Sequence, residues 1–186
     1  MTRVVDNGGM TERDEVDPIV EEWAAAHPDL DFSPLEIFSR VMRIAKRLDR
    51  VRANAFEQSG LAAWEFDVLA VLRRSGEPFR LSPKILVQAT MVSSGTMTNR
   101  IDRMAERGLV ARLTDPNDGR GVLVEMTRSG LSLVDAAISR LTHAEQELLS
   151  GLTTAERGRL PQQLRRLGLS VEQATQISTR SEKPQA

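Results

Sequence analysis

Hydrophobic residues recur at helical spacing along most of the chain. Val16, Ile19, Val20 and Trp23 lie three or four positions apart, the spacing of one helix face, and predict a first helix from about residue 12 to 26. The same spacing predicts further helices over residues 34–58, 61–74, 83–89, 94–106, 127–150 and from 153 to about 177. The chain is therefore predicted to be mainly α-helical.

One stretch breaks this helical pattern. Residues 109–113 and 122–126 are two short apolar runs, and the turn sequence Thr-Asp-Pro-Asn-Asp-Gly at 114–119 separates them. Such a pair predicts a small β-hairpin. It follows two short helices directly, and helix, turn, helix, hairpin is the order of a winged helix-turn-helix, which binds DNA.

The pattern divides the chain into five parts. We predict a disordered N-terminus over residues 1–11, N-terminal helices over 12–60, the winged helix-turn-helix over 61–127, C-terminal helices over 128–178 and a disordered tail over 179–186. The outer helices carry apolar stripes with no partner in so small a module, so we expect them to form a helical homodimer. A two-fold axis would place two half-sites of a palindromic operator roughly 10 bp apart on double-stranded DNA.

The helix over residues 94–106 is predicted to read the DNA. Met97, Ile101 and Met104 form its inward stripe, and short polar side chains occupy the opposite side. Short polar groups reach base edges, arginine binds guanine or phosphate, and a helix N-terminus favours anions. The residues expected to contact DNA are Ser93, Ser94, Gly95, Thr96, Thr98, Asn99 and Arg103, with Arg120 at the hairpin tip.

Arg100 occupies a different position on the same helix. It falls about 60° from the centre of the apolar stripe, at the boundary between the buried and exposed faces. A cation there is costly without an anion, which is either a protein carboxylate or a ligand.

Composition narrows the function classes. The net charge is −1, yet residues 1–30 hold two arginines against eight acidic residues, so they carry −6 and the remainder +5. Phosphate binding needs only a local basic face. Arg40, Arg43, Arg47 and Arg50 share one helix face, which we interpret as solvated.

Several kinds of site are not expected. The chain has no cysteine and two histidines, which leaves no pattern for a metal centre, and we expect no cofactor. No apolar run approaches ~18 residues, so no membrane span is expected, and the polar N-terminus lacks a signal-peptide core. The cytoplasm is the expected compartment. No nucleophile–base pair or phosphate loop indicates an enzyme.

Residues 91–104, Gly108-Leu-Val, Asp115-Pro-Asn-Asp-Gly-Arg-Gly and Thr127-Arg-Ser-Gly resemble the recognition helix, wing and return helix of the MarR family of bacterial transcriptional regulators. The resemblance covers about residues 12–170 and implies a ligand-responsive regulator, a repressor in our interpretation. One departure stands in the wing, where Gly119-Arg120 replaces the family's two adjacent arginines, so weaker DNA binding is expected.

A narrower resemblance concerns the added N-terminal helix. It is similar to that of the urate-responsive and PecS-like subgroup, which includes trans-aconitate-responsive regulators. The subgroup's ligand residues fall on Trp23, Asp67, Arg100 and Arg112. The resemblance implies a small anion, either urate- or purine-like or aconitate- or citrate-like, held by Trp23 and Arg100 between the dimer helices and the DNA-binding lobe. Repulsion of Asp67 by that anion would move Arg112 and the recognition helix.

Three alternatives remain open from the sequence. The chain fits a general MarR-type regulator of a phenolic compound, or a winged-helix protein-interaction module without DNA binding, or an enzyme. The polar outer face of the helix over residues 94–106 argues against the second, because a protein-binding face would be more apolar.

Overall fold

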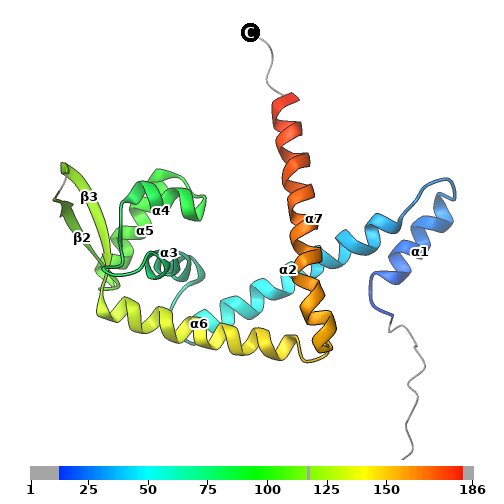
Figure 1. Cartoon of the computed structure of the whole chain (residues 1–186), viewed down its shortest axis with the longest axis horizontal. Helices are drawn as coiled ribbons and strands as arrows, with labels where there is room; N and C mark the ends of the chain where they lie inside the picture. The colour runs from blue at the N-terminus through cyan, green and yellow to red at the C-terminus, as the bar shows by residue number, and fades with distance from the viewer. Residues whose placement is uncertain (1–12, 117, 182–186) are drawn as a thin grey trace, which may run out of the picture.

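The computed structural model describes residues 13–116 and 118–181, so the predicted disordered N-terminus and most of the predicted tail lie outside these ranges. The elements are α1 (Asp17–Ala26), α2 (Ser33–Glu57), α3 (Ala63–Arg74), β1 (Arg80–Leu81), α4 (Pro83–Thr90), α5 (Ser94–Glu106), β2 (Val110–Asp115), β3 (Asp118–Met126), α6 (Arg128–Leu148) and α7 (Thr154–Ser181). They confirm the mainly α fold with a winged helix-turn-helix (Figure 1). Within these ranges no helix is both long and apolar enough to cross a membrane.

The long helices α2 and α6 carry a compact lobe at one end. The lobe contains α3, α4, α5 and the sheet, and it joins the long helices through contacts of α3 with both α2 and α6. Helix α1 packs on α2 at the far end, and α7 rises from the end of α6, away from the lobe (Figure 1). The helix-turn-helix lobe and α1 therefore lie at opposite ends of the molecule.

The hydrophobic core lies inside this lobe and at its junction with α2 and α6. The predicted inward stripe of α5 is confirmed, because Met97, Ile101 and Met104 are at most 1% exposed. Phe56 of α2 stacks on Phe66 of α3 with ring centroids 4.0 Å apart, which fixes the lobe against the long helix. The recognition helix is therefore held by its apolar side and leaves its polar side free.

The sheet differs from the predicted two-stranded hairpin. It has three antiparallel strands in the order β1-β3-β2, and the added strand β1 pairs Arg80 with Glu125 and Leu81 with Val124. An ion pair between the Arg80 and Glu125 side chains reinforces this pairing. The sequence did not predict β1, because two residues are too short to show the alternation that identifies a strand.

Two helix boundaries also differ from the sequence prediction. Helix α1 begins at Asp17, with a proline in its first turn, rather than near residue 12. Helix α7 extends to Ser181, into the segment expected to be a polar tail. A capping box begins this helix: the Glu156 carboxylate accepts from the Thr153 N–H at 2.7 Å, and the Thr153 hydroxyl accepts from the Glu156 N–H at 3.3 Å.

Many large apolar side chains outside the lobe are exposed. On α2, Ile37, Met42 and Ile44 are 54%, 74% and 53% exposed, and on α7 Leu164 and Leu169 are 51% and 53% exposed. An isolated exposed leucine is ordinary, whereas a series of them along two long helices indicates a surface that a partner covers.

A close backbone approach links the end of the recognition helix to the start of α6. The Thr127 hydroxyl donates to the Gly108 carbonyl at 2.7 Å and accepts from the Gly130 N–H at 3.0 Å. A Cβ at Gly130 would overlap the carbonyl oxygen of Leu109 and lie 3.1 Å from Cγ of Met126. Gly130 is therefore required by space rather than by its backbone angles.

We expect Gly130→Ala to lower the free energy of unfolding by about 1–3 kcal/mol, the usual cost of an overpacked buried site. Urea denaturation monitored by circular dichroism measures the change. Gly158→Ala in α7 is the matched control, because nothing lies within 4 Å of its added Cβ and alanine favours helices. Equal stability of the Gly130→Ala variant and the wild type would contradict the steric argument.

Candidate nucleic-acid interface

The outer face of α5 is polar and open to solvent. Ser93 is the N-cap, and its hydroxyl accepts from the Thr96 N–H at 3.2 Å. The Thr98 hydroxyl bonds its own helix through the Ser94 carbonyl at 3.0 Å. All the residues of this helix and its cap that were predicted to contact DNA are exposed: Ser93, Ser94, Gly95, Thr96, Thr98, Asn99 and Arg103.

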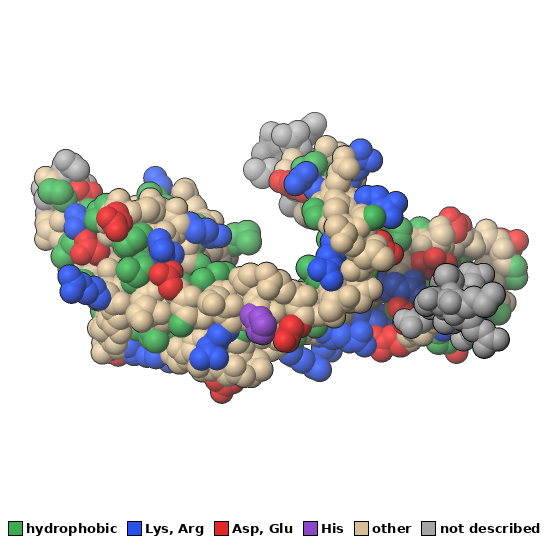
Figure 2. Space-filling view, turned by 60° about the horizontal axis from the view of Figure 1, so that its bottom comes forward, with side chains coloured by type: hydrophobic (Ala, Val, Ile, Leu, Met, Phe, Trp, Pro, Cys, Tyr) green, Lys and Arg blue, Asp and Glu red, His purple; other side chains and the backbone are tan. Residues whose placement is uncertain are grey.

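The wing provides the other predicted contact. Arg120 lies in β3, and its side chain is outside the part of the chain whose side chains are described. Figure 2 shows both basic and acidic side chains over the lobe, and further acidic side chains at the α1 end.

Trp64 is a residue of this site that the sequence pattern did not reveal. It is half-buried on α3, and the guanidinium groups of Arg100 and Arg103 lie 5.6 Å and 5.4 Å from its ring centroid. These are cation–π distances. The i, i+3 spacing of the two arginines was the available signal for a shared partner, but only the fold shows which side chain they share.

Arg100 has no carboxylate partner among the residues described in this structure. Its side chain is half-buried at the boundary of α5, as its angular position predicted, and its observed contact is the Trp64 ring. A half-buried guanidinium on an aromatic face keeps its hydrogen-bond donors available, which is a suitable arrangement for binding an external anion.

Asp67 and Arg112 lie in the same lobe as Arg100 but do not contact one another. Arg112 of β2 pairs with Asp102 of α5 at 2.6 Å, so it connects the wing to the recognition helix directly. Asp67 is exposed on α3, without an ion pair or hydrogen bond to any described residue. The structure therefore places three of the four predicted ligand residues in the lobe.

Trp23, the fourth, lies elsewhere. It is 48% exposed on α1 and stacks on His27 and Phe32, with ring centroids 5.7 Å and 6.0 Å away. Because α1 and α5 occupy opposite ends of the molecule (Figure 1), a single chain does not bring Trp23 to Arg100.

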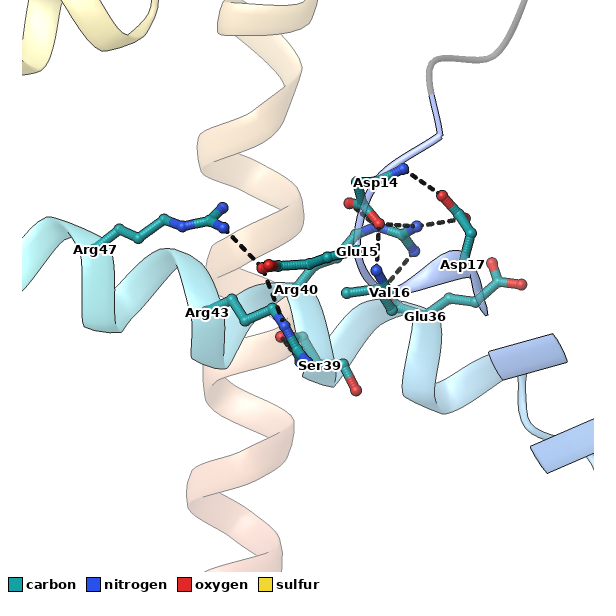
Figure 3. Close-up of polar contacts among 9 residues, drawn as sticks. All are labelled: Asp14, Glu15, Val16, Asp17, Glu36, Ser39, Arg40, Arg43 and Arg47. Carbon is teal, nitrogen blue, oxygen red and sulfur yellow. Dashed lines mark hydrogen bonds and ion pairs between the residues drawn. The ribbon is translucent and has the colours of Figure 1, made fainter. Parts of the chain in front are cut away.

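The arginine face of α2 is exposed at Arg47 and Arg50, as the sequence indicated, but three of its arginines also form ion pairs that the sequence did not predict. Arg40 pairs with Asp14 and with Asp17 at 2.7 Å each, and Glu15 pairs with Arg47 at 2.8 Å and with Arg43 at 3.1 Å (Figure 3). The periodicity of α2 could not show this, because the carboxylates belong to the segment that leads into α1.

This cluster fixes α1 on α2. The buried Val16 lies among its charges, and a hollow of about 250 Å³ is lined by Asp14, Glu15, Val16, Arg40, Arg43, Ile44 and Arg47. Hydrogen bonding to the Arg40 guanidinium is the main cause that lowers the pKa of Asp14 to about 2. The positive charges of Arg40, Arg43 and Arg47 are matched by the negative charges of three carboxylates. The cluster therefore holds α1 on α2 and has no excess positive charge to attract an added anion.

A second ion pair holds the recognition helix to the lobe. Glu65 in the first turn of α3 is 2% exposed and pairs with Arg107, which caps the C-terminus of α5. The Glu65 carboxylate also accepts from the Ala62 N–H at 2.9 Å, and Arg107 donates to the Gly60 carbonyl at 2.8 Å. The C-terminal end of α5 is therefore anchored, whereas its N-terminal end projects.

No group of three or more histidine, cysteine, aspartate or glutamate side chains suited to a metal ion occurs in residues 13–116 and 118–181. The arrangement at α5 offers hydroxyls, an amide and guanidinium groups, which suit hydrogen bonding to phosphates and base edges.

Comparison with known proteins gives consistent results. A model of the MarR family matches residues 59–121. The transcriptional regulator PecS of Dickeya dadantii is 34% identical over 146 residues, which are 78% of this chain and 88% of that protein.

Two solved structures are also similar. A cysteine-to-serine mutant of Escherichia coli MarR, complexed with operator DNA, matches with a TM-score of 0.60 at 28% identity, covering 74% of this chain and 99% of that one. Bordetella bronchiseptica BpsR, in a structure concerned with regulation of its DNA binding by 6-hydroxynicotinic acid, matches with a TM-score of 0.54 at 32% identity. That match covers 69% of this chain and 98% of BpsR.

The Glu65–Arg107 pair predicts an asymmetric mutational effect. Arg107→Ala leaves a buried carboxylate without its cation and should lower the free energy of unfolding by roughly 3 kcal/mol, the lower part of the range for broken buried pairs. Glu65→Gln removes the charge and keeps an acceptor for the Ala62 N–H, so about 1 kcal/mol is expected. Urea denaturation of both variants, with the exposed Arg50→Ala as control, tests this; a larger loss for Glu65→Gln would contradict it.

The ion-pair cluster between α1 and α2 predicts a pH dependence. The pKa of Asp14 is lower in the folded chain than its ordinary 3.8, so its contact is fully formed above that value and is lost as the pH falls toward about 2. A carboxyl NMR titration should give a midpoint near 2 in the wild type and a higher midpoint in Arg40→Met, because the largest cause of the lowered pKa is then removed while the hydrogen bond from the Val16 N–H remains. Arg50→Met should not change the midpoint; if it moved the midpoint equally, Arg40 would not be the cause.

Proposed function

The chain belongs to the MarR family of DNA-binding transcriptional regulators, and from this premise we propose that it is a repressor that binds a palindromic operator as a homodimer and releases it on binding a small organic anion. The observation that carries the proposal is the exposed polar face of α5, with Asn99 and Arg103 beyond a serine-capped N-terminus. Hydroxyl, amide and guanidinium groups on a helix anchored at its opposite end match what a major groove presents.

The exposed apolar side chains of α2 and α7 support the homodimer. A two-fold axis makes both copies use the same surface, so each long helix covers apolar residues of its partner. Dimerisation also fixes the distance between two recognition helices, which a single lobe cannot do.

The ligand proposal rests on Arg100. This guanidinium is half-buried, lacks a carboxylate partner in the described part of the chain, and lies on the helix that would read DNA. An anion bound there would repel Asp67, and the Arg112–Asp102 pair would transmit movement between the wing and α5. Trp23 reaches the same anion only if it comes from the partner subunit. A urate-like or a citrate-like anion suits these charges.

A second candidate ligand, a small aromatic acid or phenol, is favoured by a separate cavity. A hollow of about 250 Å³ between α2, α3 and α6 has an apolar wall of Phe66, Ala70, Val134, Ile138 and Leu141. Arg52, Arg73 and Arg74 lie at its edge, and Arg74 has no partner among the described residues. The structure of BpsR, which concerns regulation of its DNA binding by 6-hydroxynicotinic acid, supports this class of ligand.

Selection from a random duplex library of about 30 bp, long enough for two half-sites, tests the DNA-binding part of the proposal. The wild-type protein should enrich a palindrome, and the selected duplex then serves in fluorescence-anisotropy titrations. A winged-helix module that binds only proteins would enrich no sequence.

Arg100→Ala should remove the response to the anion and leave DNA binding nearly unchanged. Urate, xanthine, aconitate, citrate and salicylate are compared by thermal shift and by release of the selected duplex. Arg74→Ala is the matched control, because it should weaken only the binding of a ligand in the cavity between α2, α3 and α6. Normal release of DNA by the anion from Arg100→Ala would show that Arg100 does not bind it.

A further inference from the structure

Two cations of the recognition helix share one aromatic ring. Arg100 and Arg103 stand on successive turns of α5, and both guanidinium groups lie within 5.6 Å of the Trp64 ring centroid on α3. Arg103 is exposed and Arg100 is half-buried, so the ring contacts one cation that faces solvent and one at the helix boundary. Neither arginine has a carboxylate partner in the part of the chain that the structure describes.

The absence of a carboxylate at these arginines matters for phosphate binding. A carboxylate partner would cancel the positive charge and would have to be displaced by a phosphate, whereas an aromatic ring restrains the guanidinium and leaves its charge and its donors in place. A long side chain also loses rotamer freedom when it binds, and a side chain that is already held loses less.

We propose that Trp64 is a positioning residue for DNA binding, which holds the guanidinium group of the exposed Arg103 in the orientation in which α5 meets the phosphate backbone. This inference rests on the proposed DNA binding. Trp64 itself need not contact DNA, and its effect acts through Arg103. Because phosphates carry no sequence information, the effect is uniform across DNA sequences.

The alternative is that Trp64 only fills space, because it packs at the edge of the lobe core. The two roles differ in chemistry. Leucine is apolar and fills part of the space but has no π face, whereas phenylalanine keeps a π face. A purely packing role predicts that stability and DNA affinity fall together; a positioning role predicts that affinity falls even where stability does not.

The experiment compares the full-length wild type with Trp64→Leu, Trp64→Phe and Arg103→Ala on the duplex selected by the wild type, over a range of salt concentrations. Trp64→Leu should weaken binding about fivefold per half-site, and Trp64→Phe should keep most of the affinity. The slope of log affinity against log salt should stay constant in both Trp64 variants, because the number of phosphate contacts is unchanged. Arg103→Ala should reduce the slope by about 0.9 per half-site.

A second measurement covers the case in which Trp64→Leu does not fold. In a Trp23→Phe background Trp64 is the sole tryptophan, and Arg103→Ala should change its fluorescence emission, whereas Arg74→Ala should not.

Three results would each overturn the inference. A folded Trp64→Leu variant could bind DNA with wild-type affinity, Trp64→Phe and Trp64→Leu could lose DNA affinity equally, or Arg103→Ala could leave the emission spectrum of Trp64 unchanged. If the wild type enriches no duplex from the library, the proposed DNA binding fails as well. The two failures are thereby distinguished.

Discussion

The ion pair between the buried Glu65 and the exposed Arg107 is the interaction on which the orientation of α5 depends. Glu65 is the one charged side chain that is buried in the described part of the chain, so its only favourable arrangement is one that brings Arg107 to it. This fixes the C-terminal end of α5 against α3. The Thr127 hydroxyl bonds Gly108 immediately afterwards, and Gly130 allows α6 to approach the same point. The apolar stripe of α5 fixes its rotation, and its capped N-terminal end remains free for DNA.

The distribution of ion pairs explains how a chain with a net charge of −1 offers cations to phosphate. The arginines that hold the fold are paired with carboxylates. Asp14, Glu15 and Asp17 pair with arginines of α2, Asp102 pairs with Arg112 of the wing, and Glu65 pairs with Arg107 at the end of α5. At Arg100 and Arg103 an aromatic ring takes the place of a carboxylate. Net charge is therefore a poor guide to this chain's partners, because these carboxylates pair with other arginines and not with Arg100 or Arg103.

The predicted ligand residues lie in two distant parts of the chain's fold. Asp67, Arg100 and Arg112 lie on three elements of one lobe, while Trp23 lies on α1, beyond the far end of α2. The clamp of Arg40 with Asp14 and Asp17 sets the position of α1, and the exposed apolar side chains of α2 and α7 provide a surface for a second copy. A single chain thus leaves the apolar surface uncovered and keeps Trp23 apart from the other three proposed ligand residues.

The sequence by itself determined the helices, the two strands of the hairpin and the face of α5 that points inward. Helical periodicity needs only local spacing, so Met97, Ile101 and Met104 identified the buried stripe. The boundary position of Arg100 followed from the same angular argument.

Only the tertiary structure decided which side chains meet. Strand β1 became visible only through its pairing with β3, since two residues carry no period. The partners of Arg40, Arg43 and Arg47 come from a different segment, and Trp64 meets Arg100 and Arg103 across two helices. Long-range contacts of this kind depend on how helices pack against one another, and the spacing of residues within one helix carries no information about that packing.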